Sequence, residues 1–373
     1  MKGSKVHRGV FIHPCIRDYR EGLFRRLHEN FRIDFIESSY PKPKSHAWNE
    51  RIQIIKRGRF KVLPQCGIRI PFIRNTDFSI FKAFSLKYRT VIFSSFLSAP
   101  FLMLALPFKI LGKNVIVFDE TWQYPDSRLH KFIKPVVKIL AKISIDDVWV
   151  ASSRAHRFVQ EHFDGNVPST LLKNTHAEYS KYSGPPYWQK KKSILYLGRI
   201  VEIKGLDILI EAVSQIKDIN LDVYGDGPFA SICKEKVDLL GINDRVTFFG
   251  SIPHADTDKV FQEYRYFCLP SRRMRGVSQS VESWGFTVNE ALSAGCIVIV
   301  SDSVGCASDL VRSEYNGNVF LSDDVVSLKK AIVNSFSIET LPEDIHESLW
   351  NDCSYDQNLQ SIKFSFKKIG LEV

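Results

Sequence analysis

Short runs of β-branched and aromatic residues alternate with stretches of helical periodicity along most of this chain. Gly9–His13, Thr90–Phe93 and Cys296–Ser301 are such runs, and each is followed by a segment of helical period. This alternation is typical of βαβ units, in which parallel strands are covered by helices. The length of 373 residues allows two domains. We therefore expect an α/β fold with two doubly wound, Rossmann-like parallel sheets that face each other across a cleft.

The segment Tyr179–Lys192 has the composition of a linker. It holds Gly184-Pro185-Pro186 and then three consecutive lysines, which suit a semi-stiff, solvated connection. We expect one domain over residues 1–180 and a second over 190–350. A closing helix, Tyr355–Phe366 within 351–373, is expected to return to the first domain. Ligands of doubly wound sheets bind at the carboxyl ends of the strands, so we expect the functional residues there.

Positive charge is concentrated near the N-terminus. Residues 1–100 contain 20 Lys and Arg against 7 Asp and Glu, whereas the whole chain has a net charge of +10. A basic first domain attracts phosphates, nucleic acid or an anionic membrane leaflet, or is simply a solvated face. No stacked-aromatic RNA motif or helix-turn-helix pattern stands out, so nucleic acid is not the expected partner.

Compartment and membrane contact follow from two further features. The seven cysteines show no framework spacing, and the N-terminus lacks an apolar signal core, which predicts reduced, buried thiols in a cytoplasmic protein. The stretch Val91–Phe108 carries no charge over 18 residues. Because serines and two prolines interrupt it, we interpret it as a buried strand and helix, with a helix on the membrane surface as the alternative.

The first chemical motif is Gly198-Arg199 followed by Lys204-Gly205. A strand ends, a glycine turns the chain and two cations precede a helix, which is the composition of a pyrophosphate site. Surface cations around a loop are the alternative. A second motif, Gly225-Asp-Gly227-Pro, either lets the backbone approach a nucleotide or is a plain strand-to-helix turn.

The most specific motif is the pair Glu282 and Glu290. With Gly285 opening a helix, Glu282 lies before its first turn, where the amides of Phe286 and Thr287 can bind hydroxyls or phosphate. Glu290 lies one to two turns inside, where a carboxylate can accept two hydrogen bonds from a ribose diol.

In this order and spacing the three motifs resemble the GT4 family of retaining glycosyltransferases, which have the GT-B fold. The resemblance is strong over about residues 193–320, and Glu282–Leu310 is similar to members from bacterial surface-polysaccharide clusters. It implies a sugar transferred from a UDP- or GDP-linked donor to a glycan, with a polyprenyl-diphosphate-linked acceptor at the inner face of the membrane.

The resemblance also implies roles for single residues. Arg199 and Lys204 would hold the donor diphosphate, Glu290 the ribose and Glu282 the sugar hydroxyls. Backbone of Gly198, Gly285, Phe286 and Thr287 would add donor contacts, with the base near Gly225, Gly227 and Ile252. Because cations stabilise the leaving phosphate, no metal and no cofactor is expected. Asp256-Thr257-Asp258 resembles a metal motif, but we interpret it as helix capping.

The acceptor side is less well marked. Asp119 or Glu120, at the end of a strand, could assist the acceptor hydroxyl as base or orienter, or be an ordinary acidic pair. His13 and Arg17 stand where family members carry a glycine-rich turn. The loop 271–281 is basic through Arg272, Arg273 and Arg275, which either touch phosphates or are solvated.

Two other classes of protein are compatible with the sequence. One is another enzyme on a double Rossmann frame, such as a nucleotide-sugar epimerase or a phosphorylase, although no distinct cofactor lysine motif is present. The other is a nucleotide- or nucleic-acid-binding protein without catalysis, which the basic first 100 residues allow.

Overall fold

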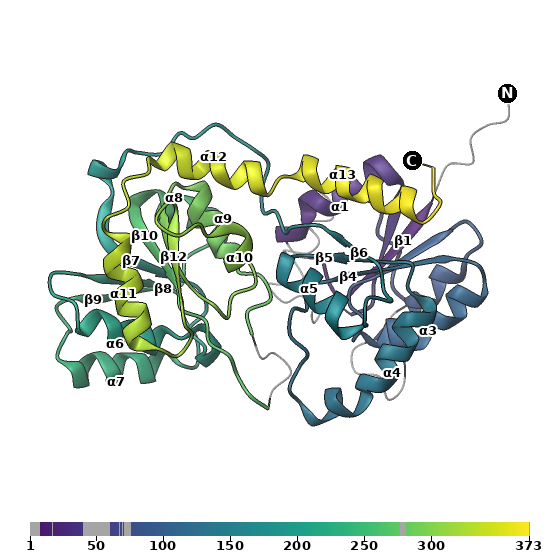
Figure 1. Ribbon diagram of the computed structural model, residues 1–373, viewed down its shortest axis with the longest axis horizontal. Coiled ribbons are helices and arrows are strands. Elements are labelled where there is room, and N and C mark those ends of the chain that lie inside the picture. Colours follow the sequence, from purple (N-terminus) through teal and green to yellow (C-terminus); the bar gives the residue numbers. More distant parts are fainter. Residues whose placement is uncertain are drawn as a thin grey trace. The chain divides into compact units, whose positions relative to one another are not determined.

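A computed structural model describes residues 8–16, 18–39, 60–66, 68, 70, 76–276 and 281–372. The chain divides into two compact units. The first comprises residues 1–122, 131–178 and 355–373, and the second comprises residues 123–130 and 179–354. Each unit contains one six-stranded sheet whose paired strands are all parallel, so the predicted α/β class is confirmed (Figure 1).

The first unit has the strand order β2-β1-β3-β4-β5-β6. Its strands are β1 (Gly9–His13), β2 (Ile33–Glu37), β3 (Thr90–Phe93), β4 (Asn114–Asp119), β5 (Asp147–Val150) and β6 (Ser169–Leu171). Its helices are α1 (Asp18–Phe31), α3 (Ala99–Ile110), α4 (Arg128–Ser144), α5 (Ser153–His162) and α13 (Tyr355–Lys368), with a 3₁₀ helix η1 at Phe78–Phe84. The first three residues of α4 are counted with the second unit. The segment Lys42–Arg74, which the sequence marks as basic and poorly periodic, lies mostly outside the described residues.

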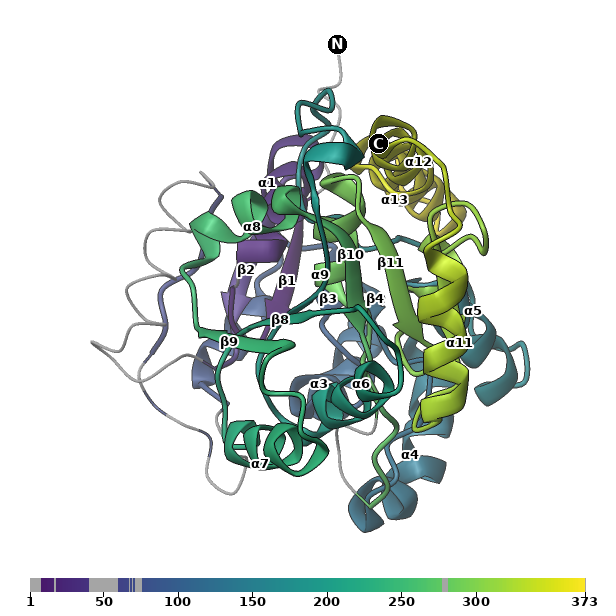
Figure 2. The same cartoon turned by 90° about the vertical axis from the view of Figure 1, so that its left-hand side faces the viewer.

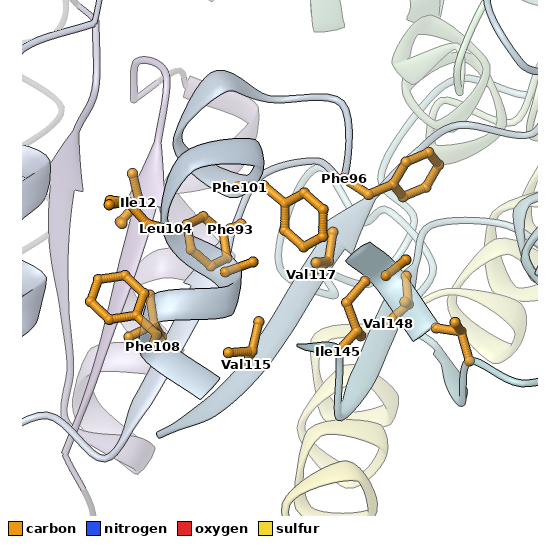
Figure 3. Packing of buried hydrophobic residues seen from close by; sticks show 14 of the residues in the cluster. Ile12, Phe93, Phe96, Phe101, Leu104, Phe108, Val115, Val117, Ile145 and Val148 are labelled. Atoms are coloured by element: carbon orange, nitrogen blue, oxygen red, sulfur yellow. The ribbon is translucent and has the colours of Figure 1, made fainter. Parts of the chain in front are cut away.

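Alternate side chains of the central strands feed two separate cores. Val115 and Val117 of β4 pack with α3, α4 and α5, whereas Ile116 and Phe118 pack with α1 and α13. The period of two in a strand sends neighbours to opposite faces, and helices on both faces make each strand apolar throughout. Figure 3 shows the first of these cores, with Phe101 of α3 among the aromatic side chains that cover the sheet.

The apolar stretch Val91–Phe108 therefore forms β3 and α3, as the buried interpretation predicts. Phe101, Leu104 and Phe108 are at most 3% exposed. Among the described residues, no helix is both long enough and apolar enough to cross a bilayer.

The second unit has the strand order β12-β11-β10-β7-β8-β9. Its strands are β7 (Lys191–Leu197), β8 (Leu221–Tyr224), β9 (Val246–Gly250), β10 (Tyr264–Leu269), β11 (Ile297–Ser301) and β12 (Gly317–Phe320). Its helices are α6 (Leu206–Ser214), α7 (Ala230–Leu240), α8 (Thr257–Glu263), α9 (Phe286–Ser293), α10 (Ala307–Leu310), α11 (Val325–Ser335) and α12 (Pro342–Asp352). Figure 2 looks onto this unit, with α6 and α7 on the near side and α11 along one edge of the sheet.

One part of the linker prediction is wrong. Lys191 and Lys192 are exposed, but Lys190 is only 5% exposed and its ammonium donates to the carbonyl oxygen of Ala294 at 2.6 Å. Ala294 is the C-cap residue of α9, so the cation lies at the negative end of a helix dipole. Burial lowers the pKa of Lys190.

The cysteine prediction is right about pairing and partly wrong about burial. None of the seven cysteines forms a disulfide, and five of them are buried. Cys66 is exposed and Cys15 is partly exposed.

The C-terminal helix α13 belongs to the first unit. Phe366 is fully buried, with its ring 5.2 Å from that of Phe31 and 5.7 Å from that of Trp149. Trp149 in turn donates to Ser365 at 2.7 Å. The last helix of the chain thus completes the core that α1 begins.

Replacing Phe366 with alanine should therefore destabilise the first unit by about 3–5 kcal/mol, because it empties a buried ring site. The matched control is Phe364→Ala on the same helix, where the ring is 62% exposed. The control should change the free energy of unfolding by no more than about 0.5 kcal/mol. Urea unfolding measures both, and equal losses would contradict the placement of α13.

Candidate functional site

The strand order of the second unit defines a switch point between β7 and β10. The chain leaves β7 toward β8 on one side, and β10 continues toward β11 on the other. Crevices at such points, outside the carboxyl ends of the strands, are where doubly wound sheets bind ligands. The loops after these two strands touch closely here, since the amide of Arg272 donates to the carbonyl oxygen of Ile203 at 2.8 Å.

Glycine at position 205 permits this approach. Gly205 has a φ of +65°, and a Cβ atom there would lie 2.0 Å from the carbonyl oxygen of Pro270. No other residue fits without moving one of the two loops. The predicted Lys204-Gly205 pair is thereby held beside the end of β10.

Lys204 and Glu282 form an ion pair at this switch point. The Lys204 ammonium lies 2.6 Å from a carboxylate oxygen of Glu282, and the two side chains are 15% and 16% exposed. Glu282 is fixed through its backbone, because its amide donates to Ser303 and its carbonyl oxygen accepts from Gly305. Two residues that the sequence assigns to different parts of a donor are thus brought together, 78 positions apart in the chain.

The start of α9 lies next to this pair in sequence. Gly285 has a φ of +101°, and a Cβ atom there would meet Val304 Cγ1 at 2.7 Å. α9 begins at Phe286, so its first amides have no preceding helical turn to bond to. The hydroxyl of Thr287 is buried without a hydrogen-bond partner among the described residues.

Glu290 lies in the second turn of α9 and is partly exposed. Burial, with a smaller contribution from the Asp258 carboxylate, raises the pKa of Glu290 to about 7. Within the described part of the chain, no hydrogen bond or ion pair to its carboxylate is recorded. A carboxylate in this state gains from any hydroxyl group that donates to it.

The three predicted glycines line the ends of β7 and β8. Gly225 and Gly227 have φ values of +140° and +159°, and Cβ atoms there would meet the carbonyl oxygens of Gly198 and Ile200 at 1.9 and 2.2 Å. Arg199 lies between Gly198 and Ile200 in the chain and is exposed. The two turns therefore stack backbone on backbone, and the guanidinium of Arg199 is the cation that reaches solvent.

Sequence reasoning missed one pair of rings near these turns. Phe249 of β9 is 48% exposed and stacks on Tyr224 with a centroid distance of 4.5 Å. Ile252, predicted to lie near the base of the donor, follows β9 and is partly exposed.

The basic loop after β10 is divided in its roles. The Arg272 guanidinium pairs with both oxygens of Asp207 at 2.8 Å and with Asp323 at 3.0 Å. It therefore anchors the loop, whereas Arg273 and Arg275 are exposed.

Asp256-Thr257-Asp258 lies at the start of α8, as predicted. Asp256 occupies the N-cap position, but its side chain makes no capping hydrogen bond and instead pairs with Lys259 at 3.0 Å. The prediction of a capping bond is wrong because the ammonium of Lys259, three residues on, takes the carboxylate.

In the first unit, the structure separates the two acidic candidates. Asp119 is 1% exposed and accepts from Ser95, from the amide of Phe96 and from the amide of Thr121, at 2.7–3.0 Å. Burial raises the pKa of Asp119, although the hydrogen bonds from these donors lower it in part. Asp119 therefore closes the loop after β3 and is not available to an acceptor hydroxyl.

Glu120 is more accessible, with a side chain 31% exposed. Arg20 and Asn174 both donate to its Oε1 atom, and Arg20 also donates to Asn174 at 2.6 Å. Arg20 is 4% exposed and lies 4.6 Å from the centre of the Phe118 ring. Neither Arg20 nor Asn174 was predicted, because they lie 100 and 54 positions from Glu120.

His13 lies at the end of β1, where its Nδ1 atom is 3.0 Å from the carbonyl oxygen of Cys15. Burial, with the Arg20 guanidinium nearby, lowers the pKa of His13 to about 3, so the ring is neutral. The buried, neutral ring with its hydrogen bond to the backbone is typical of a structural histidine. Arg17 lies outside the described residues.

Comparison with known proteins agrees with this geometry. Residues 185–348 match the family described as "Glycosyl transferases group 1". The match runs from before β7 into α12 and includes every residue predicted to bind a donor.

Relatives and solved structures extend the comparison. The chain is 29% identical over 143 residues to a GDP-mannose-dependent α-(1-6)-phosphatidylinositol monomannoside mannosyltransferase of Mycolicibacterium smegmatis, covering 37% of each protein. It is 24% identical over 203 residues to a 2-deoxystreptamine N-acetyl-D-glucosaminyltransferase of Niallia circulans, covering 51% of this chain and 50% of that one. The matches thus span no more than about half the length of these relatives.

The fold likeness covers the whole chain. Anabaena HepE in complex with UDP superposes with a TM-score of 0.73 over 97% of this chain and 99% of that one, at 15% identity. The likeness establishes the fold, which is GT-B as the sequence predicts.

The close loop contact gives a test of the switch point. Gly205→Ala and Gly241→Ala both place alanine at a φ near +65°, but only Gly205 has an atom within 4 Å of the new Cβ. Both should lose about 1 kcal/mol of unfolding free energy from the backbone alone. Gly205→Ala should lose a further 1–3 kcal/mol from the collision with Pro270. Equal losses in urea unfolding would show that the two loops can separate freely.

Proposed function

We propose that this chain is a retaining glycosyltransferase that moves a sugar from a nucleotide-sugar to a glycan. The observation that carries the proposal is the Lys204–Glu282 pair at the β7/β10 switch point, next in sequence to the N-terminus of α9. Cations and backbone amides bind a diphosphate, and a fixed carboxylate binds sugar hydroxyls. The switch point of the second unit and the adjoining start of α9 supply all three kinds of group.

The residues suit departure of a nucleoside diphosphate. Breaking the bond between sugar and phosphate builds negative charge on the leaving oxygens, and fixed cations lower that barrier. Arg199 reaches solvent and can fork two oxygens, whereas Lys204 acts as a point charge. When Lys204 turns to the diphosphate, Glu282 is released to accept from sugar hydroxyls. We therefore propose chemistry without a metal or cofactor.

Glu290 completes the donor site in this proposal. Its carboxylate lies one turn further along α9 than the Thr287 hydroxyl, and it would accept from the ribose diol. The base would lie near Gly225, Gly227 and Ile252, beside the Tyr224–Phe249 stack. UDP and GDP are the two candidate nucleotides: HepE binds UDP, and the mycobacterial relative is named for GDP-mannose.

On the acceptor side we propose Glu120 as the group that meets the attacking hydroxyl. It keeps exposed surface, whereas Asp119 is enclosed by its three donors. Arg20 and Asn174 would position the Glu120 carboxylate. We further propose a lipid-linked glycan acceptor, of the polyprenyl-diphosphate type used in surface polysaccharides. The basic N-terminal region and the relative that acts on a phosphatidylinositol mannoside support an enzyme at the inner membrane face.

Thermal unfolding with UDP-glucose, GDP-mannose and the free diphosphates tests donor binding. A ligand at 100 times its dissociation constant adds about 2.7 kcal/mol, which raises the melting temperature by several degrees. Lys204→Ala should weaken that ligand at least ten-fold. The control is Lys236→Ala, which breaks another Lys–Glu pair of the same unit, with Glu211 at 2.5 Å.

A nucleotide-sugar epimerase is the alternative, and the product separates the two. Donor incubated alone would change its sugar in an epimerase, whereas a transferase needs the acceptor. If no nucleotide raises the melting temperature, the transferase proposal is wrong.

The raised pKa of Glu290 predicts a pH dependence of donor binding. If ribose hydroxyls donate to the ionised carboxylate of Glu290, the affinity for the nucleotide-sugar reaches its maximum above pH 7. It falls as the pH drops through 7 and the carboxylate is protonated. A pKa of about 7 gives a loss of about ten-fold between pH 8 and pH 6. The measurement uses a nucleotide-sugar, whose diphosphate has no proton to titrate in this range. In Glu290→Gln the affinity should be weaker at pH 8 and should no longer vary with pH.

A further inference from the structure

Helix α4 of residues 128–144 carries an apolar stripe that the core does not cover. Its side chains are Leu129, Phe132, Val136, Ile139 and Ile143, which are 52–83% exposed. Their spacing of three and four residues places them within a sector of roughly 80° at 100° per residue. Exposed apolar side chains are ordinary when scattered, but five in one stripe form a patch that water does not favour.

The core uses a different sector of the same helix. Val137 and Ala141 are fully buried, and Ile133 and Leu140 pack against the same cluster under the sheet face that Figure 3 shows. The apolar part of α4 is therefore about twice as wide as packing in the first unit requires. An ordinary surface helix would place polar residues where Phe132 and Ile139 stand.

The remaining sector of α4 is cationic. The 17-residue helix contains Arg128, Lys131, Lys134, Lys138 and Lys142 and no aspartate or glutamate. Lys138 and Lys142 lie 2.9 and 2.8 Å from Asp164, and this carboxylate is the acidic group paired with them. The cations flank the apolar stripe along its whole length, which gives the helix an uncovered apolar face beside a positive one.

We propose that this face of α4 docks the protein on an anionic lipid bilayer. An interfacial helix has an apolar face that enters the headgroup boundary and lysines that lie at headgroup level, and both parts are present here. The proposal deepens the proposed function, on which it rests, by naming the surface that brings the enzyme to a lipid-linked acceptor. It replaces the sequence-based alternative of a membrane helix in Val91–Phe108, where Phe101, Leu104 and Phe108 are buried.

A second copy of this chain is a poorer occupant. A two-fold dimer would bring α4 against α4, so two acid-free helices with five cations each would face one another. A bilayer rich in anionic lipid offers the opposite charge, with about 1 kcal/mol for each lysine or arginine near its surface.

The test is co-sedimentation of the full chain with phosphatidylcholine vesicles, with and without phosphatidylglycerol. Wild-type protein should bind the anionic vesicles at low salt, bind weakly to phosphatidylcholine alone, and dissociate as salt rises. Phe132→Asn/Ile139→Asn should lower the partition coefficient at least ten-fold.

The matched control is Ile232→Asn/Leu239→Asn on α7 of the second unit. These two side chains are also seven residues apart on one helix and are 49% and 87% exposed. The control should bind vesicles within two-fold of wild type. Lys131→Gln/Lys134→Gln should weaken binding to anionic vesicles and flatten its salt dependence.

Three results would overturn the proposal. The first is equal vesicle binding by Phe132→Asn/Ile139→Asn and wild type, and the second is no wild-type binding to anionic vesicles. The third is a wild-type dimer in sedimentation that becomes a monomer in Phe132→Asn/Ile139→Asn. The melting-temperature rise with nucleotide-sugar is measured on the same samples and should survive in all three double variants. If neither wild type nor any variant shows this rise, the result counts against the transferase proposal. Vesicle binding then still decides, independently, whether α4 contacts the bilayer.

Discussion

The candidate site depends on the contact between the loop after β7 and the end of β10. Gly205 lies against the carbonyl oxygen of Pro270, and Arg272 bonds to Ile203 just beside it. This contact is what sets the ammonium of Lys204 within reach of Glu282, since the two residues come from different connections of the sheet. The opposite charges of Lys204 and Glu282 offset part of the cost of burying each other. In the proposed function, a ligand with its own anionic and hydroxyl groups would compete for both side chains.

Features encoded in neighbouring residues could be predicted from the sequence. The strands from Gly9–His13 to Ile297–Ser301, the glycines that open turns and the position of α13 all follow from local period and composition. The site residues of the second unit could be predicted for the same reason, because each stands at a strand end or a helix start. β6 and β12 were missed because three or four residues with Ser, Asn or Gly carry no readable period.

Features that depend on distant partners could not be predicted. The sequence does not distinguish Asp119 from Glu120, but the structure does: Asp119 is enclosed by Ser95 and its neighbours, whereas Glu120 is held by Arg20 and Asn174. The ammonium of Lys190 can be buried because it donates a hydrogen bond to the carbonyl oxygen of Ala294, over 100 positions away. Summed hydropathy directs attention to α3, but the exposed apolar stripe lies on α4, whose lysines lower its average. Hydropathy measures how apolar a segment is, whereas exposure depends on which face the sheet covers.

The state of Glu290 connects stability with function. Its folded pKa of about 7 lies above the ordinary 4.5 of a glutamate, so the free energy of unfolding falls as the pH rises between these values, and the full cost of ionisation is present above pH 7. Glutamine at this position would not ionise and would avoid this cost, so a purely structural role does not require glutamate. A partly buried carboxylate to which the described residues make no hydrogen bond is instead typical of groups that bind a ligand. In the proposed function, ribose hydroxyls that donate to Glu290 would offset the cost of its burial, so the desolvation that destabilises the empty protein would favour the occupied one.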